Sequence, residues 1–103
     1  MDRCRVDFDA MDWQTPMPGV RHKCFYAGGT KLRLVEYFPE MEPHWCSVGH
    51  FGQILVGTFE IEFDHGTEIF EAGDGVAIPE GHKYRHRARA MSTVVRAIFV
   101  EES

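Results

Sequence analysis

The chain has 103 residues and a formal net charge of −5, with 44% apolar and 26% charged residues. This length supports one domain with one core, and the apolar content excludes a wholly disordered chain. No apolar run approaches the ~20 residues that a membrane span requires, and the excess of acidic residues argues against nucleic acid as the main partner.

Strands are predicted along nearly the whole chain, because Gly, Pro or Asp interrupts the β-rich runs at intervals of about 8–12 residues. Residues 1–30 are expected to form an N-terminal arm, irregular between Trp13 and Gly19, and the first strands. Residues 31–38 predict a strand rich in Leu, Val, Tyr and Phe. Residues 59–63 alternate between apolar and acidic side chains, and with residues 67–71 they predict a hairpin.

The second half of the chain continues this pattern. Residues 76–78 predict a short apolar strand that ends at the turn 79–81. In residues 83–89 the basic side chains occupy alternate positions, and we expect them to pair with Glu60 and Glu62 of a neighbouring strand. Residues 93–100 predict a final strand buried on both faces. The chain thus has room for about nine or ten strands, enough for a closed barrel or a two-sheet jelly roll.

The cysteines indicate a reducing compartment. The sequence contains Cys4, Cys24 and Cys46, an odd number at wide spacing, and its first ten residues show no apolar signal segment. A disulfide framework is therefore not expected, and we expect a cytoplasmic protein.

Histidines give the first indication of function, because five of the six lie between positions 44 and 86. If residues 44–46 form a strand, His44 and Cys46 share one face at a backbone separation of about 6–7 Å, and a turn at Gly49 brings His50 near them. Imidazole and thiolate together suit Zn, Cu, Ni or Fe(II) rather than Mg or Ca. Taken singly, however, a strand histidine is more often only hydrogen-bonded, and Cys46 a small buried hydrophobe.

Tyr84 and His86 are two residues apart and are expected to leave the same face of one strand. The neutral phenol of Tyr84 is a poor metal ligand, because its unperturbed pKa is about 10. We therefore expect Tyr84 to donate a hydrogen bond to a ligand or a bound water.

Two segments of the chain resemble the two sequence motifs of the cupin superfamily. The first runs from His44 to His50 and is followed by Gly57, where cupins have His-x-His, three or four residues, Glu, six residues and Gly. The second runs from Gly73 to His86, where cupins have Gly, about five residues, Pro-x-Gly, two residues and His. The resemblance covers roughly residues 31–100. It implies an all-β cupin fold, a double-stranded β-helix or jelly-roll barrel, as a single domain over residues 1–103.

The resemblance also implies where metal ligands should lie. His44 occupies the place of the first cupin histidine, Cys46 that of the second, His50 that of the glutamate and Tyr84 that of the second-motif histidine. Three of the four positions are changed, and His86 is placed to supply the imidazole that Tyr84 lacks. We therefore predict a metal site formed by His44, Cys46, His50 and His86, with Tyr84 beside it. Zinc is the first choice of ion, followed by Ni or Fe(II).

Three functions remain open at this point. The chain could be a metal-binding enzyme acting on a small organic substrate, a non-catalytic sensor or carrier of a small molecule, or a structural module without an ion. The leading hypothesis is a small cupin barrel that binds a divalent metal and a small organic ligand, with no assigned reaction. We also expect a homodimer, because cupins commonly pair and the apolar arm at residues 12–20 needs a cover.

Overall fold

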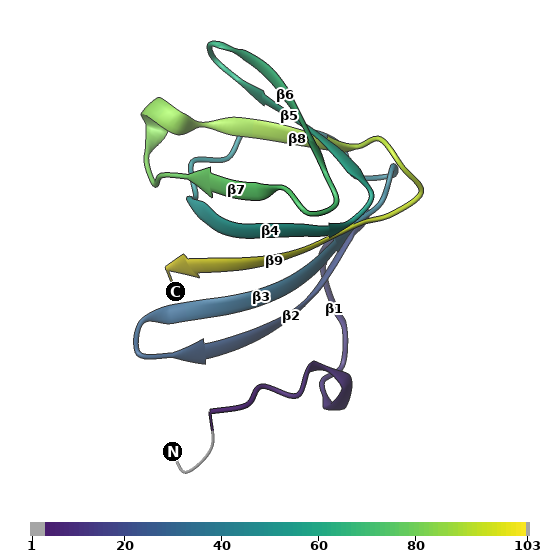
Figure 1. Cartoon of the computed structure of the whole chain (residues 1–103), viewed down its shortest axis with the longest axis vertical. Helices are drawn as coiled ribbons and strands as arrows, with labels where there is room; N and C mark the ends of the chain where they lie inside the picture. The colour runs from purple at the N-terminus through teal and green to yellow at the C-terminus, as the bar shows by residue number, and fades with distance from the viewer. Residues whose placement is uncertain (1–3, 103) are drawn as a thin grey trace.

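The computed structural model describes residues 4–102, which form nine β-strands and two short 3-10 helices (Figure 1). None of the helices in this part of the chain has the length and hydropathy of a membrane span. In chain order the elements are η1 (Phe8–Ala10), β1 (Gln14–Met17), β2 (Val20–Ala27), β3 (Thr30–Tyr37), β4 (His50–Val56), β5 (Thr58–Phe63), β6 (Gly66–Glu71), β7 (Gly75–Ile78), η2 (His82–Tyr84), β8 (His86–Ala90) and β9 (Val95–Glu102).

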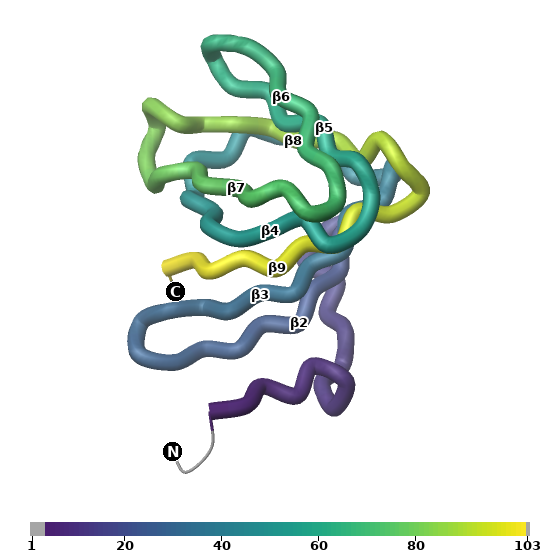
Figure 2. The backbone as a smooth tube through the Cα atoms, in the orientation of Figure 1, coloured from purple at the N-terminus to yellow at the C-terminus, as the bar shows by residue number. Residues whose placement is uncertain are grey.

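The strands form two antiparallel sheets that face each other. The larger sheet has the order β1-β2-β3-β9-β4-β7 and the smaller one the order β6-β5-β8. Figures 1 and 2 show the smaller sheet lying beyond the β4 and β7 side of the larger one, with the chain curving from one to the other. The predicted all-β jelly roll is confirmed.

Apolar side chains from both sheets meet in one core. The largest of those that are almost wholly buried are Val35, Ile54, Val95 and Phe99, all from the larger sheet. The smaller sheet contributes side chains that alternate along β5, whose apolar members are buried while Glu60 and Glu62 are partly exposed. β5 pairs antiparallel with β6, which confirms the predicted hairpin, and the alternation places Glu60 and Glu62 on the face of β5 that points away from the core.

The charged pairs lie between β5 and β8, as predicted. The two strands are in register with Glu62 opposite Arg87 and Glu60 opposite Arg89. Arg87 donates from Nε to Glu62 over 2.8 Å, and Arg89 Nη2 lies 3.1 Å from a Glu60 oxygen. The prediction thus holds for Arg87 and Arg89, whereas Arg85 pairs with Asp64 over 3.0 Å and Lys83 lies in η2, outside the strand.

The last strand departs from the prediction. β9 runs from Val95 to Glu102, and its residues alternate between buried and more exposed positions, so burial on both faces is wrong. The smaller sheet covers only one face of the larger sheet, which is why Val100 remains 46% exposed on the other. The inward face of β9 continues through Phe99 to Glu101, a buried carboxylate beyond the predicted end of the strand.

The two largest apolar side chains of the N-terminal arm at residues 12–20 are partly covered by its own chain. β1 pairs with β2, and Met17 packs against the core. The Trp13 ring lies beneath the side chains of Arg21 and Lys23, at 4.3 and 4.6 Å from its centroid. Trp13 and Met17 are therefore partly shielded within the chain, while residues 14–16 remain exposed.

Candidate metal centre

Cys46 and His86 come from distant segments and are joined through their backbones. Cys46 lies in the connection between β3 and β4, and His86 is the first residue of β8. The amide of each donates to the carbonyl of the other, over 2.8 and 2.9 Å. This reciprocal pair is an isolated antiparallel bridge, which holds the two residues directly opposite each other.

Two further hydrogen bonds fix the connection next to Cys46. The amide of Gly49 donates to the Glu80 carboxylate over 2.7 Å, and the amide of Gly81 donates to the Ser47 carbonyl over 3.0 Å. Gly49 fits because its Cα lies close to the 78–80 backbone, where an added Cβ would lie 2.8 Å from Glu80 N and from Ile78 O. The segment that carries Cys46 is thereby held against the turn that precedes β8.

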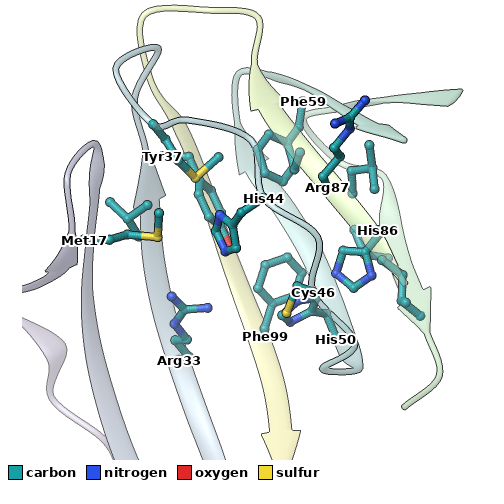
Figure 3. A pocket seen from close by; sticks show the side chains of 16 residues that line it. Met17, Arg33, Tyr37, His44, Cys46, His50, Phe59, His86, Arg87 and Phe99 are labelled. Carbon is teal, nitrogen blue, oxygen red and sulfur yellow. The ribbon is translucent and has the colours of Figure 1, made fainter. Parts of the chain in front are cut away.

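The side chains of Cys46, His50 and His86 converge. Their potential ligand atoms all lie within 4.8 Å of one another, and the two imidazole rings meet edge to face with centroids 5.1 Å apart. His50 enters from the first position of β4, opposite Ile78 of β7. Three elements therefore supply one donor group each to a common point (Figure 3).

His86 is oriented so that one ring nitrogen is free. Its Nδ1 lies 3.0 Å from the Tyr84 carbonyl, and since a carbonyl only accepts, this nitrogen carries the proton and donates. Its Nε2 is buried and has no hydrogen-bond partner among the described residues. A buried nitrogen lone pair without a partner is costly unless something fills the space before it.

His50 is oriented in the same way by Glu101. The His50 Nδ1 donates to Glu101 Oε2 over 2.5 Å, which turns the other ring nitrogen away from the carboxylate. Lys31 and Arg33 also approach Glu101, at 3.1 and 3.4 Å, and the carboxylate side chain is only 2% exposed. A carboxylate behind a histidine is the usual arrangement around a protein-bound metal, because it fixes both the tautomer and the ring orientation.

Sequence reasoning did not find Glu101, although the sequence contained a signal. Glu101 lies on the same face of β9 as three apolar residues at alternate positions, Val95, Ala97 and Phe99. Because those residues point into the core, the alternation predicts that the Glu101 carboxylate points inward as well. The expected strand stopped one residue short of it.

Proton affinities in the cluster follow from these contacts. The hydrogen bond from His50 lowers the pKa of the Cys46 thiol, and it does so against burial, with help from the Val48 amide. Burial alone would lower the pKa of His50, but its bonds to Cys46 and Glu101 outweigh burial and raise it. The His86 pKa is lowered, chiefly by burial. Burial would raise the Glu101 pKa, yet His50, Arg33 and Lys31 bring it down to about 2.

A cavity of about 110 Å³ adjoins the cluster between the two sheets. Apolar side chains form most of its wall, among them Met41, Phe59, Ile61 and Phe99. Cys46, His50 and His86 lie on one side, and Arg33 of β3 reaches in from another (Figure 3). A small molecule in this cavity would lie beside the convergent donor atoms.

Two predicted site residues lie differently from the expectation. His44 lines the cavity but is exposed and is not part of the group within 4.8 Å, because residues 42–45 form no strand to align it with Cys46. Tyr84 ends the helix η2 instead of lying in a strand, so the alternation that was to direct its ring inward does not apply. The Tyr84 side chain is 39% exposed, and only its carbonyl contacts His86.

The donor set fits a divalent metal ion with affinity for sulfur and nitrogen. One thiol with a lowered pKa and two imidazoles protonated on Nδ1 offer three ligands of the kind that zinc binds. The partnerless His86 Nε2 is the observation that a bound ion would account for directly.

By sequence, the chain matches no protein-family model and no curated protein. Its fold, however, is similar to that of solved cupin structures. KdgF from Halomonas sp. superposes with a TM-score of 0.75 at 23% identity, over 91% of this chain and 89% of that chain. The polyketide cyclase RemF from Streptomyces resistomycificus gives a TM-score of 0.77 at 22% identity, over 97% and 79%.

A sugar phosphate isomerase of the cupin superfamily from Silicibacter pomeroyi also superposes, with a TM-score of 0.75 at 15% identity, over 97% of this chain and 76% of that chain. At these identities the similarity establishes the fold alone. The chain is a small cupin-fold domain, in agreement with the motif resemblance.

Proposed function

We propose that this chain binds a divalent metal ion through Cys46, His50 and His86 and holds a small organic molecule in the adjoining cavity. The observation that carries the proposal is the orientation of the two imidazoles. Each is tied through Nδ1 to an oxygen acceptor, which leaves Nε2 as the ring nitrogen available to an ion, and the potential ligand atoms of both residues lie within 4.8 Å of the Cys46 sulfur. Zinc is the first choice, with Ni or Fe(II) next, because thiolate and imidazole form a borderline-soft donor set.

A bound divalent ion would supply Lewis acidity, which polarises an oxygen of a molecule held next to it. The chain's own groups perform the positioning. Glu101 keeps His50 in the tautomer that presents Nε2, and the Tyr84 carbonyl does the same for His86. The cavity wall excludes water from most of the bound molecule. Similar folds include an isomerase and a polyketide cyclase, and this chain is not assigned a reaction.

The test is elemental analysis of protein purified without a metal-chelating tag. Wild type should contain about one equivalent of metal, which Cys46→Ser, His50→Ala and His86→Ala should each strongly reduce. His65→Ala is the matched control, because His65 is exposed in the turn between β5 and β6. In protein loaded with Co(II), a thiolate charge-transfer band in the near ultraviolet should appear and should disappear in Cys46→Ser.

Two results would contradict the proposal. Unchanged metal content in Cys46→Ser and His50→Ala would show that the ion is bound elsewhere. A wild-type protein that takes up no metal would favour the second candidate, a non-catalytic cupin that binds a small molecule or acts as a sensor. In that case His50 and His86 would serve as hydrogen-bonding groups in the cavity wall.

We also propose that the protein works in the cytoplasm. Cys4, Cys24 and Cys46 are all free in the structure, which suits a reducing compartment. Fractionation of cells that express the native protein tests this assignment.

A further inference from the structure

The cavity wall contains two arginine side chains and no carboxylate among the described residues. Arg33 and Arg87 both line the cavity, and none of the described residues that line it is Asp or Glu. Arg87 is already paired with Glu62 on the outer side of its sheet, over 2.8 Å. Arg33 is therefore the cation to consider for a bound molecule.

Arg33 is largely shielded from solvent and only partly satisfied by its neighbours. Its Nε donates to His22 Nδ1 over 2.9 Å, and its Nη1 lies 3.4 Å from Glu101 Oε2, a long and weak contact. The side chain is 14% exposed. A guanidinium has five N–H donors, so these two contacts leave donors for another acceptor.

The charges around Arg33 do not balance. Lys31 and Arg33 both approach one carboxylate, that of Glu101, so two permanent positive charges face one negative charge. His22, the other neighbour of Arg33, adds no negative charge, since it accepts the Arg33 bond as a neutral imidazole. Among Lys31, Arg33 and Glu101, one positive charge is left over beside a mainly apolar cavity, where a charge is expensive unless it is paired.

We propose that the cavity takes a small carboxylic acid with a compact apolar body, whose carboxylate pairs with Arg33. The inference deepens the proposed function and rests on it for the use of the cavity as a ligand site. A planar guanidinium matches a carboxylate with two parallel hydrogen bonds, and the apolar wall accepts the rest of the molecule.

The size of the cavity limits the acid. A cavity of about 150 Å³ is known to hold one benzene molecule, so the 110 Å³ here suits a body of roughly four to six heavy atoms. Isobutyrate has this size, and isobutyramide is its neutral counterpart of the same shape. Because the two molecules differ in charge but not in shape, a difference between their affinities reports recognition of the charge.

The experiment is titration calorimetry of both probes against the wild type, Arg33→Gln and Arg33→Lys. Isobutyrate should bind the wild type about tenfold or more tightly than isobutyramide, because a charge-assisted hydrogen bond is stronger than a neutral one. In Arg33→Gln this preference should vanish, and in Arg33→Lys a part of it should remain. Arg89→Gln is the matched control, since Arg89 pairs with Glu60 on the outer side of the smaller sheet, and it should bind like the wild type.

Metal content, measured by elemental analysis on the same samples, separates this inference from the proposed metal site. Arg33→Gln should keep its metal and lose the preference for the acid. The preference should also persist in metal-free wild type, because Arg33 is a permanent cation.

The inference is overturned if wild type binds the two probes equally, or if Arg33→Gln still prefers the acid. It is also overturned if the preference disappears whenever the metal is removed, because the ion would then be the group that recognises the carboxylate. If Arg33→Gln does not fold, the comparison of the two probes on metal-free wild type decides. A metal-free wild type that still prefers the acid supports the role of Arg33 even where the metal assignment fails.

Discussion

Cys46 and His86 are held opposite each other by two backbone hydrogen bonds, although Cys46 lies outside the strands and His86 is only the first residue of β8. The spacing of their side chains is therefore set by a contact between a loop and the start of a strand. Such a bridge is only as rigid as the loop beside it, and that loop is fixed through Gly49 and Glu80. The first prediction follows from this dependence.

Gly49→Ala should destabilise the protein by about 1–3 kcal/mol and weaken metal binding, because the new methyl group would press against the 78–80 backbone. Urea unfolding and competition with a zinc-binding dye measure the two effects. Gly75→Ala is the control, since an added Cβ there has its nearest neighbour at 3.8 Å. Equal metal affinity in Gly49→Ala and wild type would mean that the loop does not fix the position of Cys46.

Glu101→Gln should lower metal affinity by about 10–100-fold, as is usual when a group behind a histidine ligand is changed. The amide keeps the size of the side chain but loses the charge that Lys31, Arg33 and His50 share. Glu102→Gln is the control, because Glu102 is exposed at the next position of β9. A metal titration that gives the same affinity for Glu101→Gln and wild type would remove Glu101 from the site.

His44→Ala and Tyr84→Phe should both retain metal. The donor atoms of His44 lie outside the cluster, and Tyr84 contributes only its carbonyl, which the phenylalanine variant keeps. Elemental analysis of the two variants checks the ligand set. Loss of metal in His44→Ala would restore the four-ligand site that the sequence motif implied.

Glu36→Gln should destabilise the protein at pH 7 by about 1–3 kcal/mol. Glu36 is 3% exposed, and its two oxygens accept from Arg21 over 2.6 Å and from Arg96 over 2.8 Å. Burial would raise its pKa, but these arginines outweigh burial and hold the pKa below the ordinary value of 4.5. The stability contribution is therefore fully present above pH 4.5 and is lost as the pH falls through the lowered pKa.

The measurement for Glu36 is urea unfolding of wild type and Glu36→Gln at several pH values. The difference between the two proteins should be constant from pH 7 to about pH 5 and should shrink at lower pH. A difference that grows on acidification would contradict the assignment of the charge to Glu36.

We propose that the expected homodimer forms through a surface other than the arm at residues 12–20. The large apolar side chains of that arm are at least partly covered by their own chain. By contrast, an apolar row lies on the outer face of the larger sheet, formed by Phe25, Leu32, Val100 and Phe51. Phe51 is 51% and Val100 46% exposed. Sedimentation velocity should show a dimer for wild type and for Ile69→Glu on β6, and a monomer for Phe51→Glu. A monomeric wild type at high micromolar concentration would exclude the dimer.

The fold could be predicted from local features. In β5, the alternation of apolar and acidic residues is enough to predict a strand. Around β7, the positions of Gly and Pro are enough to predict the turns, and neither prediction requires knowledge of distant contacts. The predictions were wrong mainly at the ends of strands, where the alternation of apolar and polar residues no longer indicates the backbone conformation. The alternation of residues 83–89 predicts Tyr84 in a strand, but residues 82–84 form a 3-10 helix and the strand begins only at His86.

The site could be predicted only in part, because its geometry depends on pairings across the sequence. Cys46, His50 and His86 could be selected by residue type and by the spacing of the cupin motifs. The bridge that brings Cys46 to His86, and the approach of Glu101 to His50, depend on how the sheets close. His44 has the same residue type and the expected spacing but lies outside the group.

The position of β9 has a consequence for the folding reaction. β9 follows all the other strands in the chain, yet it lies between β3 and β4 in the middle of the larger sheet. Until it inserts, β3 and β4 both have an unpaired edge towards it, and unpaired strand edges invite association with other chains. Pairings between distant segments also slow folding. Refolding at high concentration should therefore lose protein to aggregation before the central strand is in place.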